Sequence, residues 1–252
     1  MHKVNRLPEP ESLKKNAKKW TDELLAEVPK YRTFNDIPQK FVNSYRQDDV
    51  KQALGEMYEG LCCYCESPIG VQVFERIEHL MPKSKFPHLC FQWSNLNYSC
   101  EVCNSTKYKG DKWDYQNPIF DPTFDEIQNY LEVDVDTARI TPKNNNLRAI
   151  TTIEHTGLNR ESLIERRGDI AKKLKELLRI ALKAGSIEEL KDIIQSMSKI
   201  CGYPFLLNTF ADKLKCPLCQ DKDLKFVMNL VFPYLVINLP VLSIIRCAQY
   251  KK

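Results

Sequence analysis

CCYCE, at residues 62–66, opens the most informative part of this chain, which continues with IEHLMPKS at 77–84, WSNL at 93–96 and SCEVCNSTK at 99–107. The cysteines form two C-x2-C pairs, Cys62 with Cys65 and Cys100 with Cys103. Two such pairs are a ligand set for one tetrahedral zinc ion, and four protein thiolates leave no coordination position for a substrate. The pattern therefore predicts a structural zinc site that ties together the two ends of this region.

A histidine, two asparagines and a lysine follow one another through the same region. Asn95 comes sixteen residues after His79, Asn104 comes nine residues later, and Lys107 lies one helical turn further on. With Glu78 before the histidine, this order resembles the HNH endonuclease family. The likeness is greatest to its zinc-containing members, whose pattern reads CxYCE, EHxxPK, WxNL and SCxxCNxxK.

Hydrolysis of a phosphodiester needs a deprotonated water, stabilised charge on the phosphoryl oxygens and help for the leaving oxygen. We expect His79 to be the general base, because a neutral imidazole can accept a proton near pH 7. The resemblance implies that Asn95 orients it. Carboxylate and amide oxygens suit a hard cation, so Glu78 and Asn104 are expected to bind Mg²⁺ or Mn²⁺. Lys107 would meet a phosphate as a point charge.

Each of these residues also has a plain structural explanation. An isolated Glu-His pair is most often a surface dipeptide, Asn95 can stabilise a turn, and Asn104 can cap a helix. Two C-x2-C pairs alone indicate a zinc-stabilised binding module about as readily as an enzyme. The occurrence of all these elements in one order favours the nuclease.

The resemblance implies an α+β fold, mostly helical, with a ββα-metal HNH core and a structural zinc site made of four cysteines. The core would consist of a strand over residues 73–79, a short strand over 96–99 and a helix from about Cys103. We expect three regions. They are a helical region at 1–60, the nuclease core with its zinc knuckles at 61–118, and a mainly helical region at 119–252 that could offer a docking surface for a partner.

Periodicity predicts several elements around this core. Apolar residues at helical spacing indicate a helix between Leu13 and Val28, and a second helix is expected over 48–59, ended by Gly60. Residues 131–135 alternate and can pair with 138–141 as a hairpin. Asn159 is expected to cap a further helix. Three arginines near its start could pair with local acids or contact phosphate, namely Arg160, Arg166 and Arg167.

The composition sets broader limits. A net charge of +4 is compatible with a nucleic-acid substrate. Ten cysteines and no apolar leader predict a reducing compartment, the cytoplasm. The apolar segment at 226–245 is interrupted by prolines and asparagines, so we expect no membrane span. Cys216 and Cys219 form a third C-x2-C pair, and whether it binds a second metal stays open.

Outside the core, the chain is similar to the PtuB-type HNH proteins of Septu anti-phage systems, through residues 3–6, 121–122 and 158–160. This likeness implies a nuclease effector that works with a PtuA-like ABC-type ATPase, in some systems also with a retron reverse transcriptase and its RNA–DNA hybrid. The expected substrate is nucleic acid, with DNA favoured over RNA. The alternatives are a stand-alone restriction-type HNH endonuclease and a non-catalytic, zinc-stabilised nucleic-acid-binding protein.

Overall fold

The computed structural model describes residues 1–70, 74–184, 190, 193, 194, 197 and 201–214. Its α-helices are α1 (Glu11–Glu27), α2 (Gln39–Val42), α3 (Asp48–Met57), α4 (Leu147–Thr156), α5 (Glu161–Ala184) and α7 (Pro204–Leu214), and its strands are β1 (Glu75–His79), β2 (Leu96–Cys100), β3 (Leu131–Val133) and β4 (Ile140–Pro142). The predicted mixture of helices, small sheets and a cysteine cluster is confirmed. The Cys216–Cys219 pair and the apolar segment at 226–245 lie outside the described residues.

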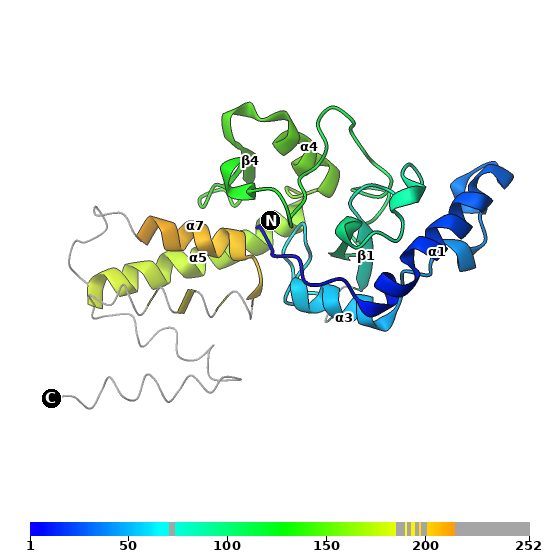
Figure 1. Cartoon of the computed structure of the whole chain (residues 1–252). Helices are drawn as coiled ribbons and strands as arrows, with labels where there is room; N and C mark the ends of the chain where they lie inside the picture. Colours follow the sequence, from blue (N-terminus) through cyan, green and yellow to red (C-terminus); the bar gives the residue numbers. More distant parts are fainter. Residues whose placement is uncertain (71–73, 185–189, 191–192, 195–196, 198–200, 215–252) are drawn as a thin grey trace.

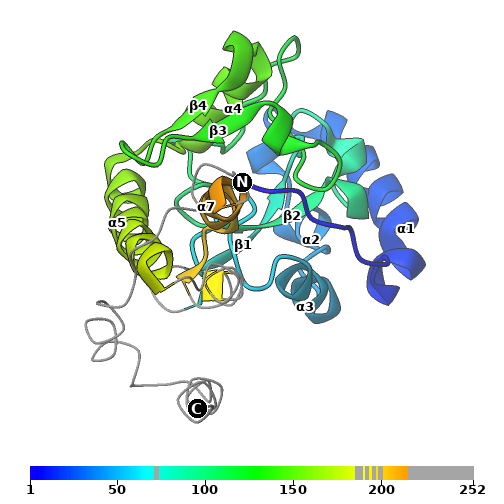
Figure 2. The same ribbon diagram turned by 90° about the vertical axis from the view of Figure 1, so that its left-hand side faces the viewer.

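An antiparallel hairpin of β1 and β2 lies between α1 and α3 on one side and α5 and α7 on the other (Figure 1, Figure 2). Its register pairs His79 with Leu96 and Glu78 with Asn97. All five residues of β2 are buried. The hairpin therefore forms the centre of the molecule, and the two buried residues of β1, Glu78 and His79, lie at the end of the strand next to the connecting loop.

The two helices predicted near the N-terminus are confirmed as α1 and α3. Leu13 and Leu24 of α1 are fully buried, and Gly60 takes a left-handed backbone conformation (φ +71°) just after α3. Arg6 fixes the segment before α1 to the hairpin, because its guanidinium donates hydrogen bonds to the carbonyl oxygens of Trp93 and Leu96, each at 2.8 Å. The N-terminal segment thus supports the hairpin from one side.

The helix predicted from about Cys103 is wrong. Residues 101–110 form successive turns, in which the Asn104 amide bonds to the Cys100 carbonyl and the Lys109 amide to the Cys103 carbonyl. The segment is rich in residues that favour turns, and it ends at Gly110 with φ +36°. These turns fold the chain back towards β1, which a straight helix would not do.

The predicted hairpin in the C-terminal part is confirmed as β3 paired with β4. Asn159 does not cap α5, which is a correction: its side chain exchanges two hydrogen bonds with the backbone of Ile140, at 2.8 and 2.7 Å. The start of α7 is tied to the first cysteine pair, because the Phe205 amide donates to the Glu66 carboxylate at 3.0 Å. Gly202 allows this approach, since a Cβ there would lie 2.4 Å from the Glu66 carbonyl oxygen.

Of the three arginines near the start of α5, Arg167 serves packing, whereas Arg166 is exposed. Arg167 is buried and donates to the carbonyl oxygens of Ala138 and Leu158, each at 2.8 Å. It is therefore not available to a phosphate.

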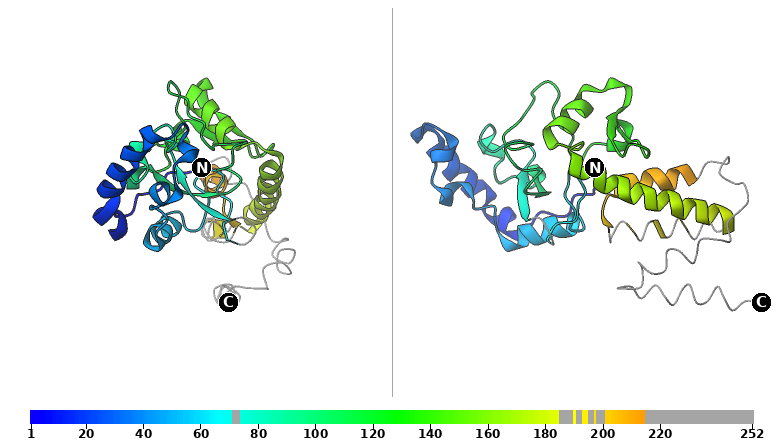
Figure 3. Two further views of the ribbon diagram at one scale, coloured as in Figure 1. Left: turned by 90° about the vertical axis from the view of Figure 1, so that its right-hand side faces the viewer. Right: turned by 180° about the vertical axis from the view of Figure 1, so that it is seen from behind.

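Seen from behind, α5 extends away from the hairpin towards the end of the described chain (Figure 3). Within the described ranges, no helix combines the length and the apolar character needed to cross a bilayer.

Candidate active site and metal centre

Four cysteines form a compact cluster at the base of the hairpin. The sulfur atoms of Cys62, Cys65, Cys100 and Cys103 all lie within 4.8 Å of one another, and all four residues are buried. The Cys65 and Cys100 sulfurs are 3.8 Å apart. A tetrahedral zinc ion with bonds of about 2.3 Å requires sulfur–sulfur distances of about 3.8 Å, so the cluster fits zinc.

Within the cluster, the pKa of Cys65 is lowered, whereas the pKa values of Cys62, Cys100 and Cys103 are raised above their ordinary value. Hydrogen bonds from Cys100 and Cys103 hold the pKa of Cys65 well below its ordinary value. The Arg160 guanidinium lies 3.4 Å from the Cys103 sulfur. Burial lowers the pKa of Arg160, but the Cys103 and Cys65 sulfurs outweigh burial and raise it. A cation beside the sulfurs offsets part of the negative charge of a zinc site with four thiolate ligands.

His79 is held in one orientation at the end of β1. Its Nε2 lies 2.9 Å from the Cys90 carbonyl oxygen, which can only accept a hydrogen bond. This bond assigns the proton to Nε2 and leaves Nδ1 as an acceptor. The residue is 7% exposed. Burial, helped by the charge of Lys83, lowers the pKa of His79 to about 3, so the imidazole is neutral at physiological pH.

The Asn95 side chain bonds to the backbone of the loop and not to the His79 ring, so its role as the orienting partner stays a prediction. Its Oδ1 accepts a hydrogen bond from the Met81 amide at 2.8 Å, and its Nδ2 donates to the carbonyl oxygens of Met81 and Leu89 at 3.0 and 3.1 Å. Asn95 therefore fixes both ends of the loop between β1 and β2. Because this loop carries the Cys90 carbonyl, Asn95 acts on His79 only through the backbone.

Glu78 forms a buried ion pair with Lys109. The Lys109 ammonium lies 3.2 Å from Glu78 Oε1, and the two side chains are 0% and 2% exposed. Tyr64 donates a second hydrogen bond to the same oxygen, at 3.2 Å. Burial raises the pKa of Glu78, and Lys109 and Tyr64 counteract part of this rise. The carboxylate predicted to bind magnesium is thus occupied by a lysine.

The other two predicted residues lie in the turns after β2. Asn104 is half-buried, and in the described part of the chain its side chain has no hydrogen-bond partner. Lys107 is exposed, with its ammonium 5.6 Å from the centre of the Tyr108 ring. The CNxxK motif predicts Lys107, which would share a helical face with Asn104, but this segment is not a helix. Lys109 is the lysine of this segment that reaches β1, where it also contacts the His79 carbonyl oxygen at 3.3 Å.

A basic cluster that the prediction did not include borders His79. We define it as Tyr45, Arg46 and Lys83. The Tyr45 ring meets the imidazole edge to face, with centroids 4.7 Å apart. Its hydroxyl accepts hydrogen bonds from Lys83 at 3.2 Å and from Arg46 at 3.4 Å. Lys83 belongs to the EHxxPK motif, so the sequence could have indicated it. Tyr45 and Arg46 lie far from this motif in the sequence.

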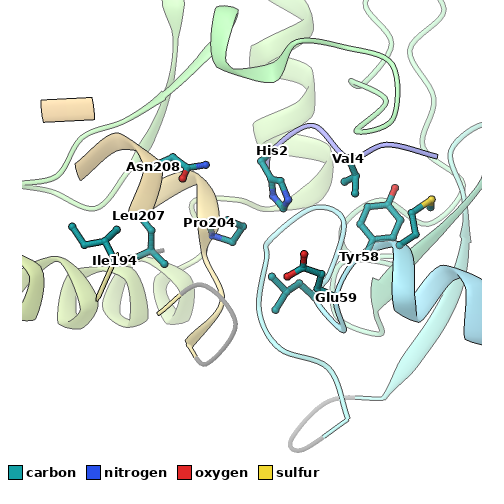
Figure 4. A pocket seen from close by; sticks show the side chains of 10 residues that line it. His2, Val4, Tyr58, Glu59, Ile194, Pro204, Leu207 and Asn208 are labelled. Carbon is teal, nitrogen blue, oxygen red and sulfur yellow. The ribbon is translucent and has the colours of Figure 1, made fainter. Parts of the chain in front are cut away.

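The cavity drawn in Figure 4 lies apart from the candidate site. It has a volume of about 220 Å³, lies between the N-terminal segment, the end of α3 and the start of α7, and is lined by residues that include His2, Tyr58, Glu59, Pro204 and Leu207. None of the predicted site residues lines it. The candidate chemistry therefore belongs to the hairpin end and not to this cavity.

Comparison with known proteins points to one class, the PtuB proteins of Septu systems, although no family model matches the chain. The chain is 28% identical over 187 residues to the Septu protein PtuB of Bacillus mycoides (strain KBAB4), a match that covers 63% of each protein. It is 32% identical over 111 residues to the Septu protein PtuB of Bacillus thuringiensis, covering 44% of this chain and 41% of that protein. The chain thus matches less than two thirds of the length of these relatives, and the similarity supports a PtuB-like identity.

Proposed function

We propose that this protein is a nuclease of the HNH type that hydrolyses phosphodiester bonds with His79 as its general base. The single observation that carries the proposal is the orientation of His79. Its Nε2 is held by the Cys90 carbonyl, Nδ1 is left as an acceptor, and the charges of Lys83 and Arg46 act on the ring. A neutral imidazole with one fixed tautomer is what proton transfer from water requires.

In the proposed reaction, Nδ1 of His79 accepts the proton of the attacking water. As the water oxygen bonds to phosphorus, the phosphorus–oxygen bond to the leaving group breaks, and the leaving oxygen takes up a proton from solvent. Lys83 and Arg46 contact the phosphate, where they compensate the charge that develops on its oxygens. A pKa of about 3 makes the free imidazole a weak base. An anionic phosphate next to the basic cluster counteracts the part of this lowering that comes from Lys83 and Arg46 and so raises the pKa of His79 when the substrate binds, while burial, the larger cause, still lowers it.

Two metals enter the proposal in different ways. Zinc would be held by the four clustered cysteines, where it supplies no chemistry at the phosphate but fixes the base of the hairpin. Magnesium at Glu78 and Asn104 stays a prediction. It requires the Lys109–Glu78 ion pair to open first, and no step of the reaction is assigned to it.

The biological role that we propose is based on the relatives that the chain resembles. We propose that this chain is the nuclease component of a Septu-type anti-phage system and works with a PtuA-like ATPase. A retron reverse transcriptase with its RNA–DNA hybrid is a further partner to be tested. The similarity to two Septu proteins named PtuB supports this role.

The test is a cleavage assay on plasmid, single-stranded DNA and RNA. Wild type and His79→Ala are each incubated alone and with any co-encoded ATPase, with and without added magnesium. Zinc content is measured first, so that misfolding is not mistaken for lost chemistry. We expect cleavage by wild type only, with equal zinc in both proteins. Equal cleavage by His79→Ala would overturn His79 as the base, and no cleavage by wild type with its partner would favour a zinc-stabilised binding protein. Cleavage of modified DNA by the lone chain would indicate a restriction-type enzyme.

A further inference from the structure

Four rings from two loops meet at the protein surface beside the candidate site. We call them the aromatic cluster: Phe86 and His88 from the loop between β1 and β2, and Trp113 and Tyr115 from the segment after Lys109. The Phe86 ring is their centre, with its centroid 5.6 Å from that of Trp113, 5.9 Å from Tyr115 and 6.3 Å from His88. Phe86 and Trp113 are half-buried, His88 is exposed, and Tyr115 is 70% exposed. A group of partly exposed rings marks an interaction surface more than a single ring does.

Both loops are anchored at His79. The loop that carries Phe86 is closed by the bond between His79 Nε2 and the Cys90 carbonyl, four residues after Phe86. The segment that carries Trp113 starts at Lys109, four residues earlier, whose ammonium contacts the His79 carbonyl oxygen. Four extended residues span about 14 Å at most. This is the length of about four stacked nucleotides.

The charges around the aromatic cluster favour an anionic partner. Five lysines lie in the two loops and the turns before them, against three acidic residues, Glu101, Asp111 and Asp114. Of the lysines, Lys109 is buried against Glu78, and Glu101 is paired with Arg76, which leaves Lys83, Lys85, Lys107 and Lys112 against two acids. Asp114 already accepts hydrogen bonds from the backbone amides of residues 116 and 117. A surface that combines exposed rings with excess positive charge is the combination with which proteins bind unpaired nucleotides, through stacking and phosphate contacts.

We propose that the aromatic cluster stacks against unpaired bases next to the scissile phosphate, so that this protein prefers a single-stranded segment of DNA or RNA over a continuous duplex. The inference rests on the proposed nuclease function and specifies its substrate class. Exposed rings cannot stack on bases inside an intact duplex, because those bases already stack on their neighbours. The cluster would recognise the flat face of an unpaired base, which DNA and RNA both have.

Binding is tested by fluorescence anisotropy in the His79→Ala background, where the ligand is not cleaved. The probes are oligothymidylate, oligouridylate and a duplex of matched length. We expect Tyr115→Ala and His88→Ala each to weaken single-strand binding, about 5- to 150-fold for a ring that stacks on a base. Tyr115→Phe should keep the affinity. Phe124→Ala is the matched control, since Phe124 is 79% exposed and lies outside the cluster.

The outcomes separate the two proposals. Unchanged single-strand affinity in Tyr115→Ala and His88→Ala overturns the stacking proposal, while cleavage that depends on His79 would still support the nuclease. Equal losses for duplex and single strand also overturn it. Loss of binding to a co-encoded ATPase, with nucleic-acid binding intact, would assign the cluster to a protein partner instead. The thymidylate and uridylate arms show which nucleic acid binds more tightly.

Discussion

Lys109→Met removes one member of the buried ion pair beneath the candidate site. The Lys109 ammonium is fully buried and contacts Glu78 Oε1 at 3.2 Å and the carbonyl oxygens of His79 and Gly110 at 3.3 Å. Removal of one partner of a buried pair costs about 3–5 kcal/mol. Tyr64 still donates to Glu78, and the carboxyl group can take up a proton, so we expect the lower value, about 3 kcal/mol. This is a large fraction of a typical folding free energy of about 5–15 kcal/mol.

The assay is urea unfolding of zinc-loaded protein. Lys107→Met is the matched control, because Lys107 is exposed in the same segment, and its change in stability should stay within about 0.5 kcal/mol. Glu78→Gln and the double variant complete the cycle. Because the two side chains are in contact, we expect a coupling energy of at least about 1 kcal/mol. If Lys109→Met loses no more stability than Lys107→Met, or if the two changes are additive, the ion pair does not contribute as described.

Three further predictions concern the cysteine cluster, the histidine and the loop. Elemental analysis should find one zinc ion bound by the four-cysteine cluster. The ion should be lost in Cys103→Ser and kept in Cys90→Ser. The pKa of His79 is about 3 in the folded protein against about 6.5 in the unfolded chain, so the unfolded state binds the proton first as the pH falls. Between about pH 7.5 and 5.5, wild type should therefore lose about 1.4 kcal/mol of unfolding free energy relative to His79→Asn; equal losses would contradict the burial of a neutral imidazole. Asn95→Ala leaves three partly buried backbone groups unpaired and should cost about 2 kcal/mol, with faster hydrogen exchange at the Met81 amide, and an unchanged exchange rate would argue against its role in the loop.

The structural features that depend on short-range sequence patterns could be predicted. The two C-x2-C pairs predict the four-cysteine cluster because the spacing within each pair already fits one metal ion. The helices α1 and α3 and the β3–β4 hairpin follow from apolar periodicity. In these cases the local signal and the packing of the folded chain agree.

The wrong predictions have a common cause. Each concerns a contact whose partner lies far away in the sequence or is a backbone group. His79 bonds to the carbonyl of Cys90, and a carbonyl oxygen has no sequence signature. The turns after Cys103 bring Lys109 to Glu78, a destination that local propensity does not reveal. Tyr45 reaches His79 from a connector that precedes α3. The residue types of the site could thus be predicted, but not the contacts between them.

The central claim is that His79 is the base of a phosphodiester-cleaving site. The most direct measurement is the single-turnover cleavage rate of His79→Ala with its partner, on the substrate that wild type cleaves best. His155→Ala is the matched control, because His155 is a half-buried histidine in the last turn of α4. With zinc content equal in all three proteins, we predict a loss of about 10²- to 10⁴-fold for His79→Ala and a rate within about twofold of wild type for His155→Ala. A loss below about tenfold in His79→Ala, or one matched by His155→Ala, would contradict the claim.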